Sequence, residues 1–192
     1  MNARISGALA ELYDLNRPRL KTVDYLAKHG IDINAVAGFC GSPTVLPITL
    51  LPNRHFDFSD HGAGAVDGVV IEARGEDGET VTDLCAWPTA DPTDVRTLLG
   101  RAPMIGLWAA LNPATYVFDT PLIMHRTPLA WLQAECAGAA VVIPRLAARA
   151  FLDLPGRIGA ADLAHQRELK SLLTDMIRGV EIVSPKPIRR AA

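Results

Sequence analysis

The sequence predicts an α+β fold in which one mixed sheet is covered by helices from both ends of the chain. Three observations lead to it: a β-hairpin over residues 66–87, a strand–helix–strand (βαβ) unit over 120–143, and amphipathic helices outside them. The 192 residues suit a single domain. Within it, residues 1–42 should be helical and residues 184–192 a flexible basic tail.

Two helices are expected in the N-terminal part, over residues 2–14 and 18–30. Apolar residues recur at helical spacing in both, and Gly30 is suited to end the second. The side chains expected on the buried face of the second helix are Leu20, Val23, Leu26 and Ala27. The segment 43–52 is too rich in proline for a central strand, so we expect an edge strand or an extended connection there.

The hairpin over 66–87 has two runs rich in β-branched residues around the turn sequence GEDGE. With residues 75–79 as the loop, Ala73 faces Val81, and nearly every apolar side chain falls on one face. A shorter loop, 75–78, would mix the two faces. The apolar face then comprises Val69, Ile71, Ala73, Val81, Cys85 and Trp87.

Asp83 is the one discordant residue on that face. Burying an unpaired charge costs several kcal/mol, so this carboxylate must be hydrogen-bonded, lie near the sheet edge, or bind a proton at an unusually high pH. A carboxylate in such a setting is a candidate general acid or base, which makes Asp83 a candidate catalytic residue.

The C-terminal half contains the expected βαβ unit. A short helix is expected over 94–99, and a better-defined one begins with Thr127 and Pro128, between strands over 120–125 and 139–144. The crossover rule makes these two strands parallel. The longest helix is expected over 160–178, followed by a strand over 180–183. Its buried side should comprise Leu163, Leu169, Leu172, Leu173, Met176 and Ile177.

The segment 55–61 is the densest cluster of potential metal ligands, with His55, Asp57, Asp60 and His61. On a strand His55 and Asp57 share one face, and Asp60 and His61 follow in a glycine-rich loop. The set could bind zinc, manganese or iron with a further ligand from elsewhere, such as Asp119 or His125. No familiar ligand spacing is matched, and polar residues on the solvated face of an edge strand give the same pattern. The expectation is therefore no cofactor, with a divalent metal as the alternative.

Charge is unevenly distributed although the net charge is only −2. Residues 53–94 carry two arginines against ten acidic residues, and residues 144–192 carry nine basic against five acidic residues. The basic region, represented by Arg167, Lys170 and Arg178 on the long helix, is a candidate nucleic-acid surface. Ordinary solvation of a helix face explains these side chains equally well.

The cysteines indicate a reducing compartment. Cys40, Cys85 and Cys136 are widely spaced and form no CxxC pair, which is typical of free thiols in a cytoplasmic protein. The longest apolar run, Met104 to Leu111, is too short to span a bilayer, so no membrane association is expected.

One region resembles other proteins. DLCAWPTADPTDVRTLLGRA followed by TPLIMHRTPLAWLQAECAGAAVVIP is similar to segments of uncharacterised bacterial proteins encoded near phage-type replication genes. The resemblance covers roughly residues 80–145. It rests on a D-L-x-A-W sequence and on a TPLxWL helix before a short apolar strand. It implies a prophage or mobile-element setting and no particular activity.

The sequence contains no catalytic motif that commits it to a reaction. The leading hypothesis is a non-enzymatic interaction or accessory protein that binds a protein partner or forms a homo-oligomer. The second is a small metal-dependent or acid/base enzyme that uses the 55–61 segment. The third is nucleic-acid binding through the basic C-terminal helix.

Overall fold

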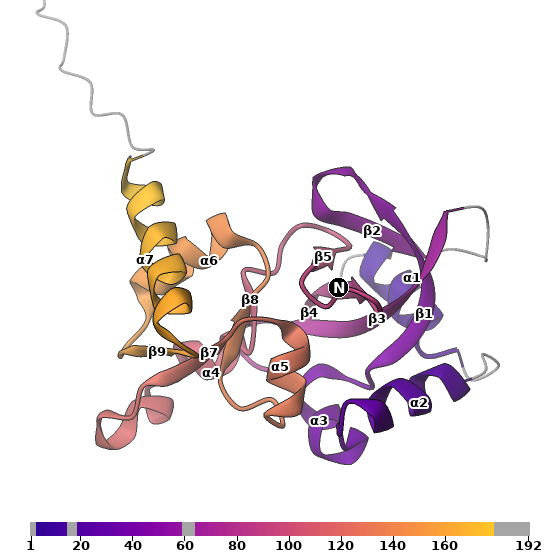
Figure 1. Ribbon diagram of the computed structural model, residues 1–192, viewed down its shortest axis with the longest axis horizontal. Helices are drawn as coiled ribbons and strands as arrows, with labels where there is room; N and C mark the ends of the chain where they lie inside the picture. Colours follow the sequence, from indigo (N-terminus) through magenta and orange to yellow (C-terminus); the bar gives the residue numbers. More distant parts are fainter. Residues whose placement is uncertain (1–2, 15–18, 59–63, 179–192) are drawn as a thin grey trace, which may run out of the picture.

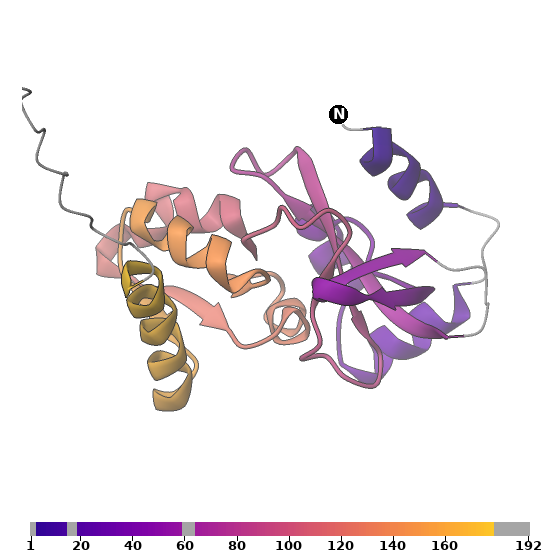
Figure 2. The ribbon, with the colours of Figure 1, turned by 90° about the horizontal axis from the view of Figure 1, so that it is seen from above.

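The computed structural model describes residues 3–14, 19–58 and 64–178 and confirms the α+β class. Its strands form a closed five-stranded barrel and a four-stranded sheet, which lie side by side (Figure 1, Figure 2). The first elements are α1 Ala3–Leu12, α2 Leu20–Lys28, α3 Ile33–Cys40, β1 Thr44–Leu51, η1 Pro52–Arg54, β2 His55–Phe58, β3 Ala65–Arg74, β4 Val81–Pro88 and β5 Arg96–Thr97. They are followed by β6 Met104–Ile105, α4 Leu107–Leu111, η2 Pro113–Asp119, β7 Leu122–His125, α5 Pro128–Gln133, β8 Ala139–Val141, α6 Pro144–Ala150, η3 Phe151–Asp153, β9 Ile158–Ala160 and α7 Leu163–Arg178.

The two predicted N-terminal helices are present as α1 and α2, with narrower bounds. The buried face of α2 differs from the prediction, because Leu20, Val23 and Ala27 are exposed. Thr22, Tyr25 and Leu26 are buried instead. Thr22 anchors the helix, since its Oγ1 accepts a hydrogen bond of 2.9 Å from the backbone of β1.

β1 is part of the barrel wall, with a paired strand on each side. This corrects the expectation, based on its prolines, of an edge strand or an extended connection. It pairs antiparallel with β2 over residues 48–51 and with β3 over residues 44–49. Pro47 is tolerated because it precedes the part of β1 that pairs with β2, where its missing N–H would matter. A parallel contact between His55 of β2 and Thr97 of β5 completes the closure.

The predicted hairpin is present as β3 and β4, with a register that differs by two residues. The pairs are Val69 with Trp87, Ile71 with Cys85 and Ala73 with Asp83. The turn spans 75–80, where Gly75 N donates to Thr80 O at 2.8 Å. A bulge between Ala73 and Arg74 moves Val81 to the opposite face, and the rest of the predicted apolar face is confirmed.

The predicted βαβ unit is formed by β7, α5 and β8, and β7 and β8 are parallel as expected. Thr127 caps α5, since its Oγ1 accepts a hydrogen bond from Ala130 N at 3.1 Å. The sheet order is β6-β8-β7-β9. The hairpin and the βαβ unit therefore belong to separate sheets, whereas the sequence analysis placed them in one mixed sheet.

The predictions for residues 94–99, 160–178 and 180–192 have different outcomes. Residues 94–99 form β5 and irregular, bent segments in place of a helix. α7 is present, but Leu163 at its first position is exposed. The strand expected over 180–183 and the tail over 184–192 lie outside the described residues.

The apolar core has three parts. One cluster fills the barrel and includes α1, and another lies between the second sheet and helices α4, α6 and α7. The third joins the two sheets, because Ile71 and Trp87 of the barrel pack in one cluster with Ile105 and Trp131 of the second half. Within the described ranges, no helix has the length and apolar character needed to cross a bilayer.

Candidate functional site

Asp83 is held in the core by hydrogen bonds. Its side chain is 0% exposed, and its two oxygens accept four backbone N–H groups. Oδ1 accepts from Leu84 and Leu99 at 2.8 Å each, and Oδ2 accepts from Arg101 at 2.7 Å and Ala102 at 3.3 Å. The hydrogen-bonded alternative from the sequence is therefore the one observed. These contacts fasten the segment after β5 to β4, a structural role, and the catalytic role of Asp83 stays a prediction.

The predicted metal ligands fall partly within the described structure. Asp60 and His61 lie outside the described residues. His55 Nδ1 lies 3.2 Å from Thr97 O, and Asp57 accepts a hydrogen bond from Phe58 N at 3.0 Å. In the part of the chain that the structure describes, no three His, Cys, Asp or Glu side chains are grouped to hold a metal.

The two suggested additional ligands are engaged elsewhere, in the second sheet. His125 Nε2 lies 2.8 Å from Ala137 O, and Asp119 forms an ion pair with Arg157. Neither is brought to His55 by the fold, so the metal hypothesis still depends on Asp60 and His61 and stays a prediction.

The predicted nucleic-acid residues lie on α7. Arg167 and Lys170 are exposed, whereas the side chain of Arg178 is outside the described part of the chain. The start of this helix carries acidic charge as well: Asp162 and Glu168 lie there, and each pairs at 2.9 Å with Arg126 of the loop between β7 and α5. Nucleic-acid binding by α7 therefore stays a prediction.

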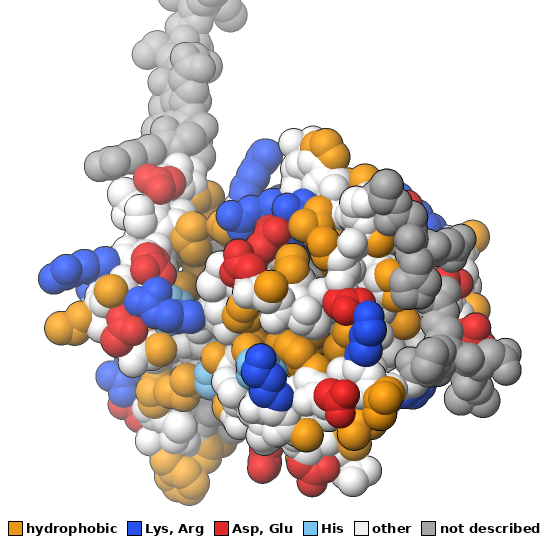
Figure 3. Space-filling model, turned by 45° about the vertical axis from the view of Figure 1, so that its right-hand side comes forward, with side chains coloured by type: hydrophobic (Ala, Val, Ile, Leu, Met, Phe, Trp, Pro, Cys, Tyr) orange, Lys and Arg blue, Asp and Glu red, His pale blue; other side chains and the backbone are white. Residues whose placement is uncertain are grey.

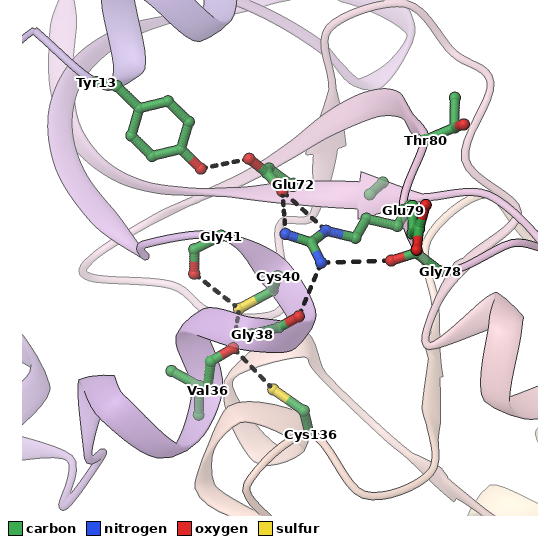
Figure 4. A network of polar contacts seen from close by, with 12 residues as sticks. Tyr13, Val36, Gly38, Cys40, Gly41, Glu72, Gly78, Glu79, Thr80 and Cys136 are labelled. Atoms are coloured by element: carbon green, nitrogen blue, oxygen red, sulfur yellow. Dashed lines mark hydrogen bonds and ion pairs between the residues drawn. The ribbon is translucent and has the colours of Figure 1, made fainter.

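A buried polar network that the sequence analysis missed joins α1, α3 and the hairpin (Figure 4). Its centre is Glu72, which is only 7% exposed. Tyr13 Oη donates to one carboxylate oxygen, and Arg74 contacts the other through Nε at 2.9 Å and a second nitrogen at 2.8 Å. Arg74 also donates to Gly38 O at 2.8 Å and Gly78 O at 3.3 Å. Burial, reinforced by the Glu72 carboxylate, raises the pKa of Tyr13.

Two cysteines lie next to this network, although 96 positions separate them in the sequence. The Sγ atoms of Cys40 and Cys136 both point at Val36 O, at 3.4 and 4.0 Å. A hydrogen bond with Cys136 and burial raise the pKa of the Cys40 thiol. Glu72 and Arg74, two apart on β3, are the sequence signal for the network. In the sequence, Glu72 and Arg74 alternate with apolar residues, and the solvated face of an ordinary strand gives the same pattern.

An exposed apolar surface lies at the far end of the second sheet. Phe118, at the tip of η2, is 98% exposed, and Val117 and Ile123 are also exposed. Asp119 and Arg157 form an exposed ion pair beside them. We call these five residues the Phe118 surface. Hydrophobic side chains gather at the lower left of Figure 3, the side on which the η2 segment lies in Figure 1.

The fold and these sites define an α+β protein with a small closed barrel joined to a second, four-stranded sheet. Its sequence matches no family model and no curated protein, and no solved structure matches it.

Proposed function

We propose that this chain is a non-enzymatic interaction protein that associates with a second copy of itself through the Phe118 surface. The observation that carries the proposal is the 98% exposure of Phe118. Burying a side chain of this size is worth roughly 2–3 kcal/mol, so covering it favours association. Val117 and Ile123 extend the apolar area that a partner would cover.

The tip that presents Phe118 is held in place. Phe118 and Asp119 both have a φ of 59°, a left-handed conformation that non-glycine residues rarely adopt. Arg157 restrains the tip, since it pairs with the Asp119 carboxylate and donates to Asp119 O at 3.2 Å. A backbone that is already restrained loses little freedom on binding.

The charges around Phe118 favour a second copy as the partner. Asp119 and Arg157 are 78% and 69% exposed, and they carry opposite charges. In a two-fold symmetric dimer, Asp119 of each copy can face Arg157 of the other copy. The surface is thus complementary to itself, which an entirely acidic or basic surface is not.

The cell setting is part of this proposal. Three free cysteines support a reducing, cytoplasmic setting, and the resemblance over residues 80–145 supports a bacterial prophage or mobile-element origin.

The first test is sedimentation equilibrium of the wild-type chain and of Phe118→Asp. We expect the wild type to form a dimer and the variant to be monomeric at the same concentration. Val23→Asp, at an exposed position on α2, is the matched control and should remain dimeric. A monomeric wild type, or a Phe118→Asp variant that still dimerises, would remove the proposal.

The second test exchanges the charges. Asp119→Arg places like charges across the interface and should weaken the dimer, as should Arg157→Asp. The double variant restores opposite charges and should recover most of the association. Because Asp119 and Arg157 also pair within one chain, a mixture of the two single variants gives the decisive result: opposite charges are restored there only between chains, so heterodimers show a direct contact between copies.

A further inference from the structure

Two hollows flank His55 on the barrel. The smaller, of about 200 Å³, is formed where the turn between β1 and β2 meets the segments after β5 and β8. The larger, of about 400 Å³, lies between the same turn, the start of α1 and the segment 98–101. Asn53 and His55 line both, so this turn forms the wall between them.

The turn has an unusual backbone that its surroundings hold in place. Asn53 and Arg54 each have a φ of 58°, and conformations of this kind concentrate at functional sites. Arg96 fixes the turn, because one guanidinium nitrogen donates to Leu51 O at 2.6 Å and to His55 O at 3.4 Å. Asp94 holds the same guanidinium at 2.9 Å. The hollows are therefore pre-formed.

The ring of His55 is fixed as well. Nδ1 lies 3.2 Å from Thr97 O, and a carbonyl only accepts, so Nδ1 donates this hydrogen bond. Gly100 leaves room for the ring, since a Cβ there would lie 2.9 Å from His55 Cε1. Among the described residues, no hydrogen-bond partner is found for Nε2, which is left for a ligand.

The charged side chains that line the hollows are all basic. Arg54 lines the smaller hollow, and Arg4 and Arg101 line the larger one. No Asp or Glu of the described chain lines either hollow, although Asp57 lies 3.7 Å from Arg4. The remaining walls are mainly apolar, with Val95, Val142 and Ile143 in the smaller hollow and Leu51, Leu98 and Leu99 in the larger one.

We propose that these hollows bind a small hydroxylated organic phosphate of the sugar phosphate class. Guanidinium groups are suited to phosphate, and Arg101 would hold it in the larger hollow. A ligand hydroxyl donates to His55 Nε2, and the apolar walls cover the carbon skeleton. The larger hollow has the volume of a small-molecule site. This site is independent of the Phe118 surface.

The test is isothermal titration calorimetry of the full chain with ribose 5-phosphate as the probe. We expect binding that Arg101→Met and His55→Ala each weaken by about ten-fold or more. Arg101 is exposed, so its variant folds even if His55→Ala does not. Lys28→Met, at an exposed position on α2, is the control and should bind like the wild type.

Ribose alone and inorganic phosphate alone should bind at least about ten-fold more weakly than the ester, because each lacks one of the two recognised groups. The proposal is overturned if the wild type does not bind ribose 5-phosphate. Unchanged binding by Arg101→Met overturns it too, as does inorganic phosphate that binds as tightly as the ester.

Discussion

Asp83 is the residue on which the segment from Leu98 to Ala102 depends for its attachment to the barrel. Three of its four N–H donors belong to that segment, and the carboxylate is fully buried. In Asp83→Asn one oxygen becomes an NH2 group that faces backbone N–H donors. We expect a loss of about 2–4 kcal/mol in the free energy of unfolding, measured by urea denaturation. Asp91→Asn, in an exposed turn, should cost less than about 1 kcal/mol, and equal losses would contradict this account.

The tyrosines give a prediction at the same scale. Burial is the main cause that raises the pKa of Tyr13, Tyr25 and Tyr116, which are the three tyrosines of the chain. As the pH rises, the tyrosines of the unfolded chain therefore ionise first, near pH 10. Their contribution to the free energy of unfolding is complete below that pH and is lost as the pH rises above it. Absorbance titration should give a higher midpoint for the folded than for the urea-unfolded protein. Coincident midpoints would contradict the burial.

At the scale of elements, local patterns predicted what depends on local sequence. The cap at Thr127, the parallel strands of the βαβ unit and, apart from Val81, the apolar face of the hairpin are confirmed. The hairpin register was missed because the turn is longer than predicted and a bulge follows Ala73. Asp77 stabilises the longer turn, since its side chain accepts hydrogen bonds from Glu79 N and Thr80 N. Closure of the barrel was missed because it brings together strands far apart in the sequence, and no single segment encodes it.

The candidate sites, too, were predicted where local sequence determines them and missed where distant segments do. The sequence analysis singled out Asp83 as discordant and His55 as a candidate metal ligand. It did not predict the partners of either, because the donors to Asp83 and the carbonyl that fixes His55 are backbone groups of a later segment. The Glu72 network was missed for a related reason, since two of its members, Tyr13 and Gly38, come from the residue after α1 and from α3.

The contact between α3 and the end of α5 gives a prediction for the thiols. Cys40, Cys85 and Cys136 are all buried, and the pKa values of Cys40 and Cys85 are raised, so little reactive thiolate forms. We expect no reaction with Ellman's reagent in the native protein at pH 8, and three equivalents after unfolding in guanidinium. Rapid labelling of one native thiol would contradict this packing.

At the scale of the molecule, the cluster that joins the two sheets predicts that they unfold together. Trp87 of β4 and Trp131 of α5 are both fully buried in this cluster, so neither half keeps its core when the other unfolds. We expect a single cooperative urea transition in which tryptophan fluorescence and far-ultraviolet circular dichroism coincide. Ile105→Ala, in the shared cluster, should lower the midpoint of both signals together, at a cost of about 2–5 kcal/mol. Two separated transitions would show that the barrel and the second sheet are independent domains, because only a shared core forces both halves to lose their structure at one denaturant concentration.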